Sequence, residues 1–171
     1  MPDRMTRVVL PSEIDQAYLL EKASYPHDEA ASLEILKYRQ DEAPDLFLGH
    51  FEEDTLIGYV CASRYHGDEL TEESMKVHIP EGASVCIHSV VVWEKRRRQG
   101  IALHLLKEFI YRVKETQSGV LRILLICRAK HIPLYTRAGF VLTGPSKVQH
   151  GRGTWFAMEM TINGKENEYF Q

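Results

Sequence analysis

The chain has 171 residues, 44% of them hydrophobic and 26% charged, and its formal net charge is −3. These proportions are typical of a soluble globular domain with a sizeable core. The negative charge argues against a general nucleic-acid binder, and no apolar run approaches the roughly 20 residues that span a bilayer. The first ten residues lack the apolar segment of a secretory signal, and three cysteines form no complete disulfide framework. We therefore expect a cytoplasmic protein that contacts neither membrane nor nucleic acid, with a monomer as the default state.

No repeat, low-complexity tract or linker divides the chain, so a single domain is expected over residues 1–165. The last six residues, ENEYFQ at 166–171, resemble the remnant of a protease-cleavable tag. Such a remnant is excluded from reasoning about the fold.

The first elements are a short strand and a helix. TRVVL at 6–10 is β-branched and apolar, which predicts a strand. Residues 11–25 place apolar side chains at helical spacing. Ser12 followed by Asp15 is a variant of the capping box, so Ser12 is the expected cap of this helix.

A second helix and a hairpin follow. Asp28 is positioned to cap a helix over 29–43. Two apolar, period-two runs within 45–65 flank the acidic turn 52–54, which predicts a hairpin. The polar stretch that follows contains one expected short helix, at 71–77.

The second half of the chain alternates buried strands with helices. Its strands are expected at 84–93, 121–127, 141–147 and 154–162, and its helices at 101–114 and 131–140. The first two of these strands are almost continuously apolar, which is typical of strands buried on both faces. Because a helix joins them, they predict one parallel crossover in a mostly antiparallel mixed sheet, an α+β fold.

A basic turn lies between the strand at 84–93 and the helix at 101–114. Four consecutive cationic residues, 95–98, are followed by Gln99 and Gly100. A helix N-terminus exposes unpaired N–H groups and carries partial positive charge, so it attracts anions. Gly100 allows a bulky anion to approach the backbone. The succession of strand, basic glycine turn and amphipathic helix predicts a phosphate-binding turn.

These residues resemble a known family. The pattern Arg97-x-x-Gly100-x-Ala102 resembles the acetyl-coenzyme A signature of the GNAT superfamily of N-acetyltransferases, and PLYTRAGF at 133–140 resembles its recurrent later segment. The order of elements is similar to that fold over residues 5–162. The resemblance implies a seven-stranded mixed sheet with helices on both faces and a splayed fourth and fifth strand.

Longer blocks, such as IHSVVVWEKRRRQGIALHLL, resemble the arylalkylamine (serotonin) N-acetyltransferases in their non-vertebrate or fungal form. This resemblance implies acetyl-coenzyme A as cosubstrate, an amine as acceptor and no metal. It implies that the backbone of the fourth strand binds the pantetheine arm and that the basic turn binds the pyrophosphate. The implied cofactor-binding residues are Val90, Val91, Val92, Arg97, Arg98, Gln99, Gly100, Ile101, Ala102 and Leu103.

The reaction requires a base and an acid. An alkylammonium has a pKa near ~10.4, so the amine must lose a proton before it attacks the thioester, and the departing thiolate then needs one. His88 is the candidate base, acting through water, and Tyr135 the candidate acid; both roles are implied by the resemblance. By this resemblance, the vertebrate enzymes have the pattern His-x-His where this chain has Cys86, Ile87 and His88, so the first histidine is missing here. A thiol is a poor proton acceptor unless it is acidified.

The amine pocket is less sharply defined by the sequence. By resemblance, Tyr25 and Pro26 belong to a loop over this pocket, and Trp155 and Phe156 are candidates for an aromatic wall. These aromatic residues favour an arylalkylamine such as tryptamine, serotonin or phenylethylamine. Asp28 and the adjacent Glu29 would favour a polyamine, unless they only complement a helix dipole. A protein amine as substrate, or an inactive acetyl-coenzyme A sensor, are the remaining alternatives.

Overall fold

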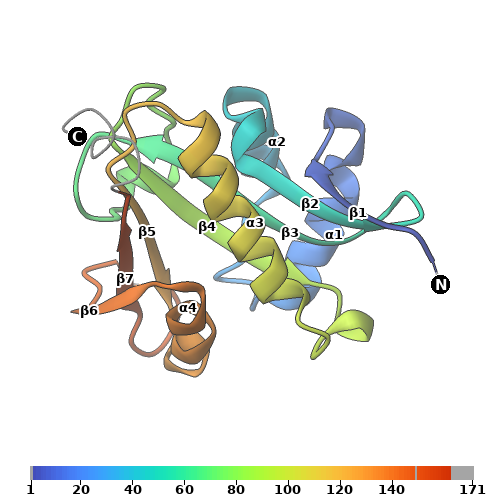
Figure 1. Ribbon diagram of the computed structural model, residues 1–171. Coiled ribbons are helices and arrows are strands. Elements are labelled where there is room, and N and C mark those ends of the chain that lie inside the picture. Colours follow the sequence, from blue (N-terminus) through green and yellow to red (C-terminus); the bar gives the residue numbers. More distant parts are fainter. Residues whose placement is uncertain (1, 149, 163–171) are drawn as a thin grey trace.

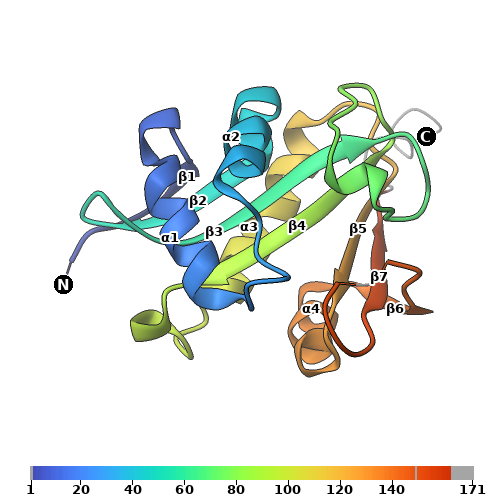
Figure 2. The ribbon, with the colours of Figure 1, turned by 180° about the vertical axis from the view of Figure 1, so that it is seen from behind.

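The computed structural model describes residues 2–148 and 150–162. The strands are β1 (Arg4–Val8), β2 (Phe47–Glu52), β3 (Thr55–Tyr65), β4 (Ser84–Val92), β5 (Arg122–Cys127), β6 (Val141–Pro145) and β7 (Phe156–Thr161). The helices are α1 (Ile14–Ser24), α2 (Leu33–Glu42), α3 (Ile101–Thr116) and α4 (Ile132–Ala138). Helices α3 and α4 cover one face of the sheet (Figure 1), and α1 and α2 cover the other (Figure 2).

The sheet order is β1-β2-β3-β4-β5-β7-β6, and β4 and β5 are its parallel pair. The expected mixed, mostly antiparallel seven-stranded sheet is therefore confirmed. Strands β4 and β5 pair only over 84–86 and 122–124. Beyond these residues the two strands diverge (Figure 1), which leaves one edge of β4 without a strand partner among the described residues. This splay positions the candidate site.

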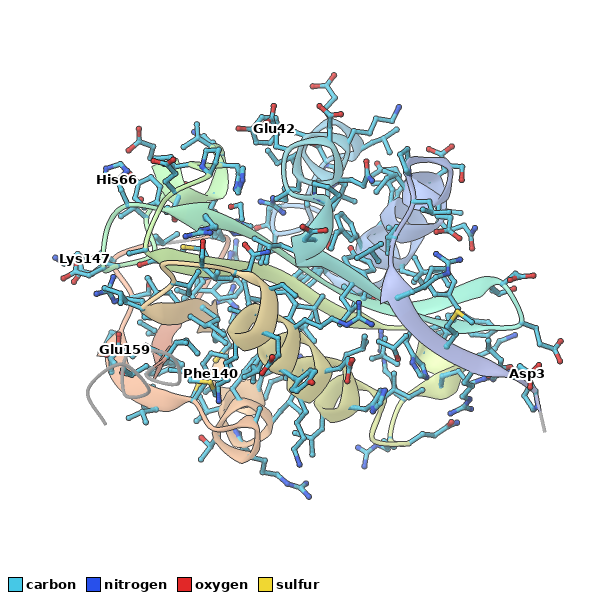
Figure 3. The ribbon with its side chains drawn as sticks, turned by 45° about the horizontal axis from the view of Figure 1, so that its top comes forward. Asp3, Glu42, His66, Phe140, Lys147 and Glu159 are labelled. Carbon is cyan, nitrogen blue, oxygen red and sulfur yellow. The ribbon has the colours of Figure 1, made fainter. Side chains whose placement is uncertain are left out.

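Two hydrophobic clusters hold the helices to the sheet. Leu105, Phe109 and Val113 of α3 recur at helical spacing and are almost fully buried against the sheet. Ile14 and Leu36 belong to a second cluster between the other face and helices α1 and α2. Each such side chain contributes about 1.5–3 kcal/mol when fully buried. Charged side chains such as those of Glu42 and Lys147 lie on the outside of the molecule (Figure 3).

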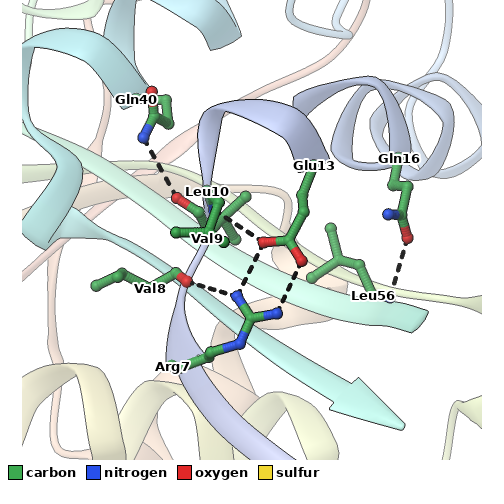
Figure 4. A network of polar contacts seen from close by, with 8 residues as sticks. All are labelled: Arg7, Val8, Val9, Leu10, Glu13, Gln16, Gln40 and Leu56. Atoms are coloured by element: carbon green, nitrogen blue, oxygen red, sulfur yellow. Dashed lines mark hydrogen bonds and ion pairs between the residues drawn. The ribbon is translucent and has the colours of Figure 1, made fainter. Parts of the chain in front are cut away.

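The start of α1 differs from the sequence expectation. A 3₁₀ turn, Pro11–Glu13, precedes the helix, and no side chain caps α1. Glu13 instead accepts a hydrogen bond from the amide of Leu10 at 2.9 Å and two from the guanidinium of Arg7 (Figure 4). The prediction that Ser12 caps this helix is therefore wrong, because the ion pair with β1 fixes the turn.

The cap of α2 also differs. Ser32 caps α2, accepting a hydrogen bond from the amide of Ile35 at 3.1 Å. Asp28 was the expected cap, but the helix begins later in the chain than predicted. The carboxylate of Asp28 instead lies against Gly151. A Cβ added at Gly151 would be 2.7 Å from an oxygen of this carboxylate. Asp28 is therefore beside the segment before β7.

Two irregularities shape the central strands. Glu53 and Asp54 form the two-residue turn of the β2–β3 hairpin, both with positive φ. The register between β3 and β4 shifts from Cys61–Ser89 to Ala62–Ile87, so His88 is an extra residue on β4. Such a bulge twists a strand and re-aims the side chain it carries.

The segment between β3 and β4 forms a 3₁₀ turn, Glu73–Met75, where a short helix was expected. The hydroxyl of Ser74 donates to the carbonyl oxygen of Thr71 at 2.7 Å and accepts from its amide at 2.8 Å. The hydroxyl of Tyr65 donates to the carboxylate of Glu73. These bonds fix the turn over the middle of β4.

Within the described residues, no helix is both long and apolar enough to cross a membrane. The expected tag remnant at 166–171 lies outside the described residues.

Candidate active site

Three adjoining hollows follow the splayed edge of β4. We call them the outer hollow, at the start of α3; the middle groove, between β4 and α4; and the inner pocket, lined from α1, β4, β5 and the segment before β7. The outer hollow and middle groove share Val92, Arg97, Ala102 and Leu134. The middle groove and inner pocket share Tyr25, Val90 and Tyr135. The hollows therefore adjoin one another along this edge.

The outer hollow is built around the start of α3. Gly100 is the N-cap residue with φ of 79°, and no side chain caps the helix. A Cβ at Gly100 would have no atom within 4 Å, so the backbone faces open space. The preceding Arg98 also has positive φ, 62°. The first amides of α3 are thus presented to any anion in this hollow.

The basic residues before α3 have different partners. Arg96 pairs with Glu52 of β2 at 2.8 Å, and this pairing raises the pKa of Arg96 and lowers that of Glu52. Arg97 donates to the carbonyl oxygen of Val92 at 2.9 Å and so crosses the mouth of the middle groove. Arg98 lies exposed beside the outer hollow, which Arg137 of α4 also lines. This arrangement gives the outer hollow several cations.

The middle groove presents backbone groups of β4. The hydroxyl of Tyr25 donates to the carbonyl oxygen of Val90 at 3.2 Å and accepts from its amide at 3.3 Å. Burial is the main cause that raises the pKa of Tyr25, so the hydroxyl stays protonated. The amide and carbonyl groups of Val90 therefore face the edge where β5 has diverged, and both are bonded to the Tyr25 hydroxyl. The side chain of Val91 points into the cluster under α1.

His88 lies in the inner pocket and is held by Ser63. Its Nε2 atom is 2.7 Å from the Ser63 hydroxyl oxygen, and that hydroxyl is also 3.4 Å from the carbonyl oxygen of Ser74. If Ser63 donates to Ser74, it must accept from Nε2–H, which leaves Nδ1 as the proton acceptor. His88 Nδ1 is buried and has no hydrogen-bond partner among the residues that the structure describes. Burial, and then the charge of Arg39, lower the pKa of His88 well below its usual range.

Arg39 of α2 is a buried cation near His88. Its Nη2 donates to the carbonyl oxygen of Met75 at 2.9 Å, while its Nε has no partner within the described part of the chain. Arg39 and Ser63 therefore hold successive carbonyl groups, those of Met75 and Ser74, on the same turn. The sequence analysis missed both residues, because neither belongs to a recognisable motif.

Tyr135 lies where the middle groove meets the inner pocket. Its ring packs edge-on to Phe140, with centroids 6.0 Å apart. Burial is the main cause that raises the pKa of Tyr135 well above its usual value. The phenol is therefore a permanent hydrogen-bond donor at physiological pH.

The buried thiols are poor proton acceptors. Burial raises the pKa of Cys86 to about 12, although a contact with Ser74 opposes this shift. Burial also raises the pKa of Cys127, to about 11. Cys86 therefore stays a neutral thiol.

The inner pocket combines two carboxylates with apolar and aromatic side chains. Glu21 accepts hydrogen bonds from the Tyr59 hydroxyl at 2.5 Å and from the Ala31 amide at 3.0 Å. Glu29 pairs with Arg128 at 3.3 Å. The remaining lining residues include Met75, Ile87, Ile126, His150 and Trp155.

Some expected site residues lie apart from these hollows. Pro26 is exposed and its carbonyl oxygen accepts from the amides of Glu29 and Ala30 in a turn. Phe156 begins β7 and pairs with Cys127 of β5, while Trp155 alone of the two lines the inner pocket. Gln99 accepts a hydrogen bond from Arg4 at 3.1 Å.

Three other expected cofactor-binding residues do line the outer hollow: Ile101, Ala102 and Leu103.

Other lining residues were not anticipated. Lys130 and His131 line the middle groove, and Arg137 lines the outer hollow. Arg137 could have been found from the sequence, because it is the cationic residue within the segment PLYTRAGF. Among the described residues, no three His, Cys, Asp or Glu side chains are placed to hold a metal ion.

Comparisons with known proteins agree with this architecture. The chain is 31% identical over 119 residues to serotonin N-acetyltransferase of Mesocricetus auratus, a match that covers 70% of this chain and 57% of the relative. The matched region thus spans less than two thirds of that enzyme. The loading GNATL domain of CurA from Lyngbya majuscula shares the fold with a TM-score of 0.83 at 13% identity, over 94% of this chain and 98% of that one.

The GphF GNAT-like decarboxylase, solved in complex with isobutyryl-CoA, shares the fold with a TM-score of 0.80 at 16% identity, over 93% of this chain and all of that one. A neighbour of this fold therefore binds an acyl-coenzyme A. The sequence profile of the acetyltransferase (GNAT) family matches residues 13–140, which is most of this chain. The chain belongs to the acetyltransferase (GNAT) family.

Proposed function

We propose that this acetyltransferase transfers the acetyl group of acetyl-coenzyme A to the primary amine of an arylalkylamine such as tryptamine, serotonin or phenylethylamine. The observation that supports this most is the row of adjoining hollows from the start of α3 to the inner pocket, with Tyr135 where the groove meets the pocket and His88 in the pocket. In this proposal the outer hollow holds the pyrophosphate of the coenzyme, the middle groove holds its pantetheine arm, and the inner pocket holds the amine.

The coenzyme's pyrophosphate fits the outer hollow. The amides from Arg98 to Leu103, in the basic turn and the first turn of α3, would bind its oxygens, and Arg97, Arg98 and Arg137 would add charge. Gly100 fits this role because its backbone faces open space. The pantetheine arm would bond to the backbone of Val90 and the neighbouring residues of β4. Tyr25 occupies the same groups of Val90, so its hydroxyl must leave them when the coenzyme binds.

The acetyl thioester supplies an activated carbonyl carbon for the amine. His88 accepts the amine's proton, through water, at the Nδ1 atom. A histidine with a lowered pKa remains neutral at pH 7 and able to accept. An alkylammonium of pKa ~10.4 would hold its proton against such a base in water, but burial in the inner pocket lowers the ammonium's pKa too.

Tyr135 stabilises the sulfur as it leaves. Full transfer of its proton to a thiolate is unfavourable, because burial raises the pKa of the phenol. A hydrogen bond to the developing negative charge has no such penalty and acts where charge appears. Tyr135 lies between the groove and the pocket, which is where the sulfur would be.

The assay is release of coenzyme A from acetyl-coenzyme A with and without amines. Saturable release with tryptamine and phenylethylamine, with the acetylated amine identified by mass, is the expected result. Release with a lysine peptide but not with these amines would overturn the substrate class. Tight coenzyme binding without release to any amine would instead indicate a sensor domain.

A further inference from the structure

Arg128, the residue that follows β5, connects three segments around the inner pocket. Its guanidinium pairs with Glu29 at 3.3 Å, donates to the carbonyl oxygen of His150 at 3.0 Å and lies 4.3 Å from the ring centroid of Trp155. The Arg128 side chain is 21% exposed and that of Glu29 is 10% exposed, so the pair is largely shielded from water. Arg128 therefore contributes a fixed positive charge to the rim of this pocket.

Among the described residues, both carboxylates that line this pocket already have partners. Glu21 and Glu29 are the carboxylates that line it. Glu21 is occupied by the Tyr59 hydroxyl and the Ala31 amide, and Glu29 by Arg128. A second ammonium entering this pocket would lose its hydration and find no unpaired carboxylate, which is unfavourable.

Arg128 also fixes an aromatic wall. Trp155 is 8% exposed, and its Nε1–H donates to the same His150 carbonyl oxygen at 2.7 Å. With the guanidinium stacked on it, the indole plane has little freedom. A rigid aromatic wall beside Met75, Ile87 and Ile126 suits a flat apolar group.

We propose that Arg128 determines the substrate class of this pocket: by pairing with Glu29 and stacking on Trp155, it selects a monoamine with an uncharged aromatic remainder and rejects polyamines. This inference rests on the proposed acetyl transfer. From the sequence, Asp28 and Glu29 left open whether the substrate is an arylalkylamine or a polyamine, and in this proposal Arg128 decides between them.

The test compares kcat/KM for tryptamine and spermidine in the wild type and in Arg128→Gln. The wild type is expected to prefer tryptamine. Freed from its partner, Glu29 would attract the second ammonium, so Arg128→Gln should raise kcat/KM for spermidine about tenfold or more and lower that for tryptamine. The gain should shrink at high salt, since it is electrostatic. Arg128→Met, which keeps an apolar contact with Trp155, provides the same test should the glutamine variant not fold.

Two further variants separate charge from packing. Arg128→Gln combined with Glu29→Gln should lose the spermidine gain, because no carboxylate is freed. Arg122→Gln removes a charge from the opposite end of the same strand, where Arg122 donates to Ser84 at 3.0 Å, and should leave the tryptamine-to-spermidine ratio unchanged.

The possible failures are distinct. A wild type that acetylates no amine would refute the proposed transfer. A wild type that acetylates tryptamine, with a ratio unchanged by Arg128→Gln and Arg128→Met, would refute the role of Arg128 alone. A wild-type preference for spermidine would also overturn it.

Discussion

The Nε2 atom of His88 lies 2.7 Å from the hydroxyl oxygen of Ser63. This contact fixes the imidazole at the bulge of β4, and no group of the described residues bonds to the opposite ring nitrogen. A histidine held at one nitrogen and open at the other is arranged to accept a proton at the open position.

Replacing His88 by glutamine should reduce kcat/KM for tryptamine by about 10²–10³-fold, because the general base is lost. The acidic limb of the pH profile should disappear with it. Because the pKa of His88 is lowered well below its usual range, steady-state rates measured from pH 9 down to the lowest pH at which the protein stays folded would show this. His66→Gln, at an exposed position, is the control and should behave as the wild type. An unchanged limb in His88→Gln would exclude His88 as the base.

Replacing Arg39 by glutamine should move the acidic limb of kcat/KM to higher pH. The charge of Arg39 lowers the pKa of His88, so its removal lets that pKa rise and the base becomes protonated at a higher pH. Above the limb, the rate should stay close to that of the wild type. The pH profile of kcat/KM measures the shift in the free enzyme.

The control for Arg39 is Arg64, a second buried arginine on β3. Its Nε donates to the carbonyl oxygen of Gly82 at 2.8 Å and its Nη2 to that of Ser118 at 2.8 Å. Arg64→Gln should lower the melting temperature without moving the limb. Equal shifts in both variants would show that unfolding, not charge, caused them.

Replacing Tyr135 by phenylalanine should lower kcat by about 10²-fold while KM for acetyl-coenzyme A changes little, because one donor to the developing charge is lost. Since the pKa of Tyr135 is raised, its ionisation should produce no basic limb in the wild type up to pH 9. Rates measured with saturating tryptamine test both statements. A large rise in KM with unchanged kcat would assign Tyr135 to binding instead.

Replacing Gly100 by alanine should weaken coenzyme A binding about tenfold or more, because the new methyl group enters the space where the pyrophosphate is proposed to lie. The left-handed backbone at Gly100 adds a stability cost of about 1–2 kcal/mol. Gly119→Ala is the matched control, since Gly119 has a similar φ of 76° but lies beyond the other end of α3. Calorimetric titration with coenzyme A should find weaker binding in Gly100→Ala alone.

The sequence by itself determined the order of elements and the position of the basic turn before α3. Apolar periods of two and 3.6 residues are local properties, so they located the strands and α3 within a few residues. The residues of the basic turn that ends at Gly100 are consecutive in the sequence, so the sequence alone could predict this turn. The splay of β4 and β5 followed from family resemblance and is confirmed by their short pairing.

The tertiary structure decided which polar groups meet. Ser12 and Asp28 had the right chemistry for caps, but Glu13 and Ser32 have the positions that contact the backbone. Sequence pattern identifies a group that can form a hydrogen bond and does not identify its partner.

The inner pocket shows the same limit most clearly. Arg128 and Glu29 are far apart in the sequence, and each alone suggests only a surface charge. The register of β5 with β7 brings the end of β5 beside Trp155, and the loop after α1 packs against it so that Glu29 and Arg128 neutralise one another. Charges interact through distance and shielding, which only the folded chain defines.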